Sequence, residues 1–304
     1  MGRKHDLEPL ALQAWEQEIG ADLALALTPS KRAAHPQRVH TRADLPEGAF
    51  AALEEALGPL RESDLIVIPA GARLVDPQER RYAYVPTQVL AACERGAALW
   101  VERSDTPGVC ALIPAGRLAA VDEEHILLAA RLSLLGATAR LSVHYNAVGR
   151  PLLQEPLKRL RGAAASEPRP TPRTSTDVTL LPVKWRSALA SALLHPDDPV
   201  VAVFGRVPPE EFGGRRRECL LALTPWELIV IRDPEVVSAA AAYGLDTLYL
   251  PRGHMARASL STGELRLLVN DAEIPIKLGD ELAADISDRL GPYLPLPAAA
   301  EGGR

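Results

Sequence analysis

From residue 64 onward, much of the chain consists of short apolar runs in which polarity changes at every second position. In the segment 139–146, apolar side chains alternate with polar ones, and the segment 273–278 has the same alternation on one of its faces. A period of two is typical of a strand with one buried face, which antiparallel sheets commonly contain. The pattern predicts short antiparallel strands over most of 64–146 and 199–278.

Two segments that follow these strands have a helical period instead. Leucine and isoleucine residues recur every three or four positions on one face, namely Leu153, Leu157 and Leu160 in the first segment and Leu282, Ile286 and Leu290 in the second. Pro156 removes a backbone donor, so the first helix is expected to begin late or to kink there. Each half of the chain is thus predicted to end in one amphipathic helix.

The region before residue 61 has a different texture. The segment 7–27 is predicted to be a helix, the proline-containing and basic segment 28–42 a loop, and the segment 45–60 a second helix closed by Gly58 and Pro59. This region is expected to form an N-terminal helical segment over residues 1–61.

The segment 163–176 is predicted to be a linker, because it has no large apolar residue and contains three prolines. At 304 residues the chain is long for a single core. The predicted division is therefore a first domain at 62–162, a linker at 163–176, a second domain at 177–294, and a disordered tail at 295–304.

The two predicted domains share a short sequence. "LIPAGRLAAV" at 112–121 and "YLPRGHMARA" at 249–258 both contain Pro, any residue, Gly and a basic residue, followed by strand-like sequence. Pro114 and Gly116 match Pro251 and Gly253 at a spacing of 137 positions. We interpret these pairs as the same strand boundary in two copies of one fold, a tandem repeat.

Composition excludes several classes of function. The formal net charge is −5, and neither half has an excess of basic residues, so general nucleic-acid binding is not expected. The three cysteines contain no CxxC pair, which indicates neither a zinc site nor a disulfide framework and fits a reducing cytoplasm. No apolar run is long enough for a membrane helix, no leader sequence is evident, and no phosphate-loop or dinucleotide motif occurs.

Several segments of the chain resemble a known protein family. "LLALTPWELIVIRD" at 220–233 followed by "TLYLPRGHMARASL" at 247–260 is similar to the bacterial pleckstrin-homology-like domains, and "ALIPAGRLAAV" at 111–121 fills the corresponding place in the first half. The resemblance covers most of 64–161 and 199–293. It implies an α+β, mainly β, fold: two bent antiparallel β-barrel or sandwich domains, each closed by a C-terminal helix and used for binding rather than for chemistry.

The sharpest candidate site is an arginine cluster in the segment 205–219, consisting of Arg206, Arg215, Arg216 and Arg217. In lipid-binding members of the pleckstrin-homology superfamily, basic residues around this first hairpin hold phosphorylated headgroups. Guanidinium groups bind phosphate through two parallel hydrogen bonds. The alternative is a solvated charged loop, balanced by the nearby glutamates at 210, 211 and 218.

Other titratable residues predict little chemistry. The adjacent carboxylates Glu123 and Glu124 are expected to be solvated at a turn, because general acid–base catalysis needs opposed groups in a cleft. His125 and His144 are expected on two strands of one hairpin, as exposed or hydrogen-bonded residues rather than as metal ligands. No catalytic residue, metal site or cofactor is predicted.

The sequence therefore leads us to expect a cytoplasmic, non-enzymatic interaction or scaffold protein whose partner is an unidentified protein or a second copy of itself. The alternative is a peripheral binder of anionic lipid at the inner membrane face, or of another phosphate-bearing ligand, through the arginine cluster. An enzyme with an unfamiliar site is the third reading.

Overall fold

A computed structural model describes most of the chain. The described residues are 10–12, 17–19, 35–76, 81–103, 108–126, 129–165, 168, 176–206, 219–233, 244–261, 263–278 and 280–295. For 10–12, 17–19, 72–76, 81–84 and residues 126, 206, 281 and 288, only the backbone is described.

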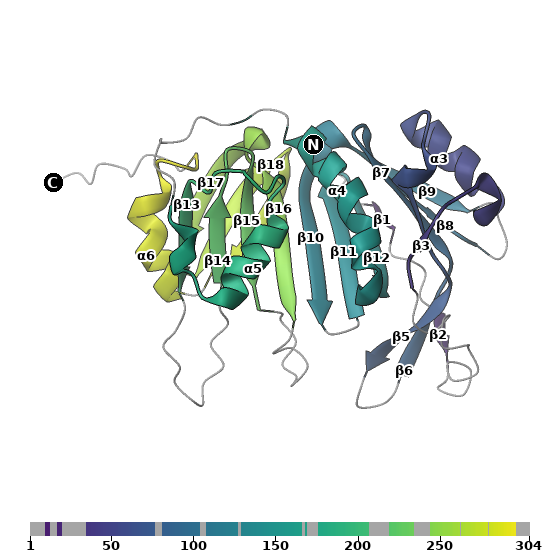
Figure 1. The fold of residues 1–304 in the computed structure, drawn as a ribbon, viewed down its shortest axis with the longest axis horizontal. Helices are drawn as coiled ribbons and strands as arrows, with labels where there is room; N and C mark the ends of the chain where they lie inside the picture. Colours follow the sequence, from purple (N-terminus) through teal and green to yellow (C-terminus); the bar gives the residue numbers. More distant parts are fainter. Residues whose placement is uncertain are drawn as a thin grey trace, which may run out of the picture.

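The largest element is an eight-stranded sheet that contains strands from both halves of the chain (Figure 1). Its order is β1 (Leu10–Leu12), β12 (Ala139–Asn146), β11 (Ala129–Gly136), β10 (Leu118–Ile126), β16 (Leu245–Pro251), β15 (Glu227–Arg232), β14 (Cys219–Leu223) and β13 (Ala202–Arg206). All neighbours are antiparallel except β1 and β12, which run parallel.

Three smaller antiparallel sheets complete the β-structure. The first contains β3 (Gln37–Arg38), β4 (Leu65–Ile68), β7 (Gln88–Cys93), β8 (Gly96–Val101) and β9 (Val109–Pro114). The second contains β17 (Met255–Ser261), β18 (Glu264–Val269) and β19 (Ala272–Lys277), and the third β2 (Gln17–Ile19), β6 (Arg81–Val85) and β5 (Gly71–Asp76). The fold is mainly β, as predicted, but no sheet closes into a barrel within the described residues.

Within the described residues, four α-helices pack on these sheets: α3 (Ala49–Leu57), α4 (Arg150–Ala164), α5 (Val183–Ala192) and α6 (Asp280–Leu290). The predicted apolar stripes of α4 and α6 are buried, which confirms both closing helices. The predicted late start of α4 is wrong, because the helix begins at Arg150 and continues through Pro156. Pro151 occupies its first turn, where a missing backbone N–H costs nothing.

The N-terminal prediction is half right. Helix α3 confirms the helix expected within 45–60. The helix expected over 7–27 is wrong where the structure describes that segment, because residues 10–12 and 17–19 form β1 and β2. These short strands pair with β12 and β6, and such tertiary pairing overrides a local helical pattern.

The buried apolar residues form three clusters. One lies under α4 and α5 and includes Leu141 and Leu153 from the first half together with Ile229 and Tyr249 from the second. Another fills the space between β13–β16, β17–β19 and α6, and the third packs α3 on β4, β7 and β8. The first cluster and the eight-stranded sheet thus both cross the predicted domain boundary.

The predicted linker and tail lie mostly outside the described residues. Helix α4 extends through Ala164, two residues past the expected end of the first domain. At the far end of the segment, the backbone N–H of Thr176 donates to the carbonyl of Val200. Pro295 accepts a hydrogen bond from the N–H of Ala258, and residues 296–304 are not described. The domain boundaries themselves remain a prediction.

The order of elements repeats around the shared sequence. Pro114 and Pro251 each end a strand, as predicted, and each is followed by a three-residue 3-10 turn, Ala115–Arg117 and Arg252–His254. The next strand has a register shift at its second residue, Ala119 in β10 and Ala256 in β17. Two further antiparallel strands and a helix then follow in both halves.

No helix in the described part of the chain combines the length and the apolar character needed to cross a membrane.

Candidate functional site

The predicted arginine cluster is not brought together by anything the structure describes. The backbone of Arg206 ends β13 opposite Cys219, and its side chain lies outside the described atoms. Arg215, Arg216 and Arg217 lie outside the described residues altogether. The cluster therefore remains a prediction.

The structure brings several buried charged residues together along two neighbouring strands, β10 and β16. These two strands are antiparallel neighbours, and Val121 lies directly opposite Tyr249. We call the strip of residues along this pair of strands the seam. It joins the two halves of the chain, and charged side chains lie on both of its faces.

On the face covered by α4, Arg150 grips Glu123. The Nε and Nη2 atoms of Arg150 donate to the two carboxylate oxygens at 2.8 and 2.9 Å, and the Tyr145 hydroxyl donates to one of them at 3.3 Å. Glu123 is 4% exposed. Burial opposes its ionisation, but the hydrogen bonds and charge of Arg150 outweigh burial and lower the pKa of Glu123.

A second buried pair connects the two halves directly. Arg161, in the last turn of α4, donates through Nε and Nη2 to the carboxylate of Glu227 at 2.9 and 2.6 Å. Its Nη2 also donates to the carbonyl of Ala192 at the end of α5, at 2.7 Å. The guanidinium lies over the ring of Tyr249, 3.6 Å from its centroid. Because both charges are buried, removing either one would leave the other buried without a partner of opposite charge.

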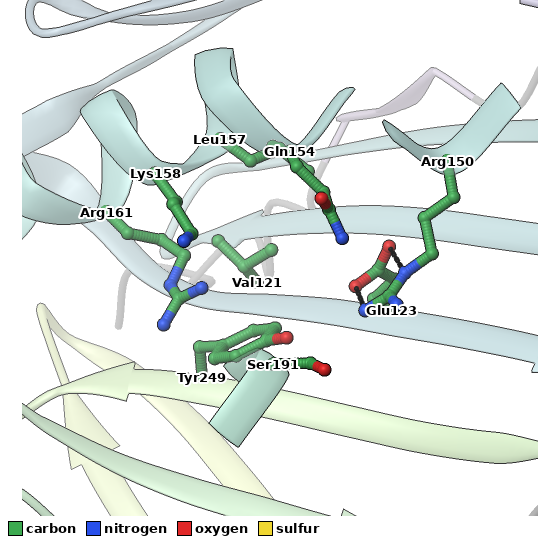
Figure 2. A pocket seen from close by; sticks show the side chains of 9 residues that line it. All are labelled: Val121, Glu123, Arg150, Gln154, Leu157, Lys158, Arg161, Ser191 and Tyr249. Atoms are coloured by element: carbon green, nitrogen blue, oxygen red, sulfur yellow. Dashed lines mark hydrogen bonds and ion pairs between the residues drawn. The ribbon is translucent and has the colours of Figure 1, made fainter. Parts of the chain in front are cut away.

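A small pocket lies between these two pairs. It has a volume of about 20 Å³ and is lined by Val121, Glu123, Arg150, Gln154, Leu157, Lys158, Arg161, Ser191 and Tyr249. Figure 2 shows Lys158 and Gln154 pointing from α4 toward the strands, with the Arg161 guanidinium above the Tyr249 ring. The lining residues of α4 recur every three or four positions, so one helix face supplies them.

On the opposite face of the seam, carboxyl groups outnumber guanidinium groups. Asp122 and Glu124 of β10 meet Asp246 of β16, and Glu124 and Asp246 are direct partners in the ladder. Arg131 contacts Glu124 at 3.0 Å and Asp122 at 3.6 Å. Arg232 contacts Asp246 at 2.6 Å. Three carboxyl groups thus face two cations.

Asp122 and Asp246 lie on the same face of the paired strands. They are 8% and 3% exposed. Burial, then the charge of Asp246, then the hydrogen bond between them raise the pKa of Asp122 to about 7. Below about pH 7 the proton on Asp122 reduces the negative charge of this cluster by one.

Two expectations about these residues need correction. Glu123 and Glu124 are not solvated at a turn; they lie within β10 and point to opposite faces of the sheet. His125 lies in β10 and not in the β11–β12 hairpin that contains His144, and the two histidines are on opposite faces of the sheet. Burial and the charge of Arg150 lower the pKa of His125.

Sequence reasoning did not single out Arg150, Arg161, Glu227 or Asp246. A signal was present, because Glu227 and Asp246 interrupt strands that are otherwise largely apolar. Central strands buried on both faces usually contain near-continuous apolar runs, so a carboxylate there needs a buried cation. The sequence does not say which of its many arginines supplies that cation.

The comparisons with known proteins identify no family. No family model matches the chain, and the search of curated proteins finds no match. Among the described residues, no group of three or more His, Cys, Asp or Glu side chains is placed to hold a metal ion.

Proposed function

We propose that this chain is a non-enzymatic interaction or scaffold protein, built on two pleckstrin-homology-like units that share one sheet. The repeated order of elements supports the two units: each half has a sheet, a Pro–x–Gly turn, a bulged strand, two more strands and a helix. Ion pairs and a shared core hold the units in a fixed relation, as a platform for a partner requires.

One surface feature carries the interaction function. In the described part of the chain only four large apolar side chains are exposed: Leu112, Val148, Leu180 and Val183. Two of these lie three residues apart, at 84% and 67% exposure, with the exposed Pro182 between them. We call Leu180, Pro182 and Val183 the apolar patch.

Helix α5 fixes the position of the apolar patch, because its other side is buried in the core. Trp185 and Leu189, on the other side of α5, are each 2% exposed and belong to the core that both halves share. Lys184 is tied to Asp233 at 2.8 Å beside the patch. Adjacent exposed apolar side chains on a fixed support are typical of a protein-binding surface, whereas a scattered one needs no explanation.

The experiment compares partner capture by three forms of the full chain. The double variant L180S/V183S removes most of the apolar patch, and V148S removes an exposed valine elsewhere. Neither change touches the core, so the melting temperature should stay within a few degrees of the parent. A protein retained from native-host extract at high salt by the parent and by V148S, but lost with L180S/V183S, supports the proposal. Equal retention by all three forms contradicts it.

A further inference from the structure

The pocket of Figure 2 has hydrogen-bond donors that the described residues leave unused. Within the part of the chain that the structure describes, no hydrogen-bond acceptor contacts the ammonium of Lys158, Nη1 of Arg161, the side-chain amide of Gln154 or the hydroxyl of Tyr249. Arg161 and Tyr249 are only 5% and 4% exposed, whereas Gln154 and Lys158 are half-buried, so the donors lie where the pocket opens to solvent.

Each carboxylate in or beside the pocket already has an arginine partner. Both oxygens of Glu123 bind Arg150, and both oxygens of Glu227, just behind the pocket, bind Arg161. Lys158 is the third cation, and these two carboxylates are balanced without it. The pocket therefore has an excess of one positive charge, which favours an anion.

The size of the pocket restricts that anion. A volume of about 20 Å³ holds about one water-sized group, so a ligand can place only an oxygen or two inside the pocket, and the rest of the ligand stays at its mouth. A phosphate group offers several acceptor oxygens at once, which suits donors converging from α4 and from β16, whereas a carboxylate offers two. We propose that this pocket binds the phosphate group of a ligand, with Lys158 and Arg161 supplying charge and Tyr249 supplying a neutral donor.

The site has a structural consequence that the interaction function does not require. Lys158 and Gln154 come from α4 of the first half, whereas Tyr249 and Ser191 come from β16 and α5 of the second. A phosphate held between them bridges the seam. It should therefore stabilise the folded chain by RT ln(1 + [L]/Kd), an amount that rises with the phosphate concentration.

The test is calorimetric titration of the full chain with inorganic phosphate at constant ionic strength. K158A removes the ammonium charge that the two carboxylates do not balance, and Y249F removes the hydroxyl but keeps the ring beneath Arg161. K277A is the matched control, because it removes the same charge from the exposed end of β19. We expect K158A to weaken binding roughly tenfold or more and Y249F severalfold, with K277A unchanged. Phosphate should raise the melting temperature of the parent and of K277A more than that of K158A.

Two arms distinguish the source of the phosphate. If vesicles containing phosphatidic acid bind the parent and K277A but not K158A, the ligand is a lipid headgroup; if they do not bind, it is a soluble phosphate ester. Either result supports the site when inorganic phosphate binding depends on Lys158. No binding of inorganic phosphate at millimolar concentration, or equal binding by the parent and K158A, overturns it.

Discussion

The carboxyl pair of Asp122 and Asp246 makes a direct prediction about pH. Asp122 has a pKa of about 7 in the folded chain, against about 4 in an unfolded chain. A group whose pKa is raised by folding stabilises the fold at pH values below its unfolded pKa, and that stability is lost as pH rises through its folded pKa. The parent therefore loses stability from Asp122 between about pH 4 and pH 7.

The D122N variant isolates this loss. Asparagine cannot ionise, and its amide can donate to Asp246 as the protonated acid does. Between pH 5 and pH 7 each unit costs the parent about 1.4 kcal/mol, so the stability of D122N relative to the parent should rise by roughly 2–3 kcal/mol from pH 5 to pH 8. Arg131 and Arg232 lower the pKa of Asp122 and are already included in its value.

The assay is urea unfolding of both proteins at pH 5, 6, 7 and 8. D285N is the control, because Asp285 is exposed on α6 and should give a flat difference over this range. A difference between D122N and the parent that does not change with pH would show that folding does not raise the pKa of Asp122, and the description of this face of the seam would be wrong.

Three other predictions concern the fold and the arginine cluster. I286A and L157A each truncate a buried side chain of a closing helix and should each cost about 2–5 kcal/mol in the free energy of unfolding; values near zero in urea titrations would mean that these helices are peripheral. Proteolysis between 165 and 176 should give two fragments that stay together in gel filtration, because β10–β16 pairing and the shared core bridge the cut; separate elution at low micromolar concentration would contradict the continuous sheet. R215S/R217S should leave association with anionic vesicles unchanged in co-sedimentation if the partner is a protein; salt-sensitive vesicle binding that this variant abolishes would favour the lipid alternative.

The sequence predicted well wherever the period of the pattern reflects one buried face. The alternation in β12 and β19 and the leucine stripe of α4 come from local rules, and the structure confirms them. The match between Pro114 and Pro251 predicted a common strand boundary in both halves, because a proline ends pairing at the same point in each.

The seam was beyond the reach of such rules. The alternation of β10 does not predict which strand pairs with its second edge. That edge pairs with β16, more than one hundred residues later, and is not left exposed to solvent. Without that pairing, the sequence suggests only that Asp122 and Asp246 are unrelated surface carboxylates and that Arg161 is an ordinary charge at the end of a helix. The strands at 10–12 and 17–19 were missed for the same reason, because their partners are distant in sequence.

The central claim, that this chain presents a docking surface for a protein, is tested most directly at Val183. A photo-crosslinking amino acid placed there in the native host should yield a discrete protein adduct of defined mass on irradiation. The same amino acid at Val148, exposed to a similar degree on the other half, should yield none. Absence of any adduct at 183, adducts to lipid alone, or the same adducts at both positions would contradict the proposed interaction function.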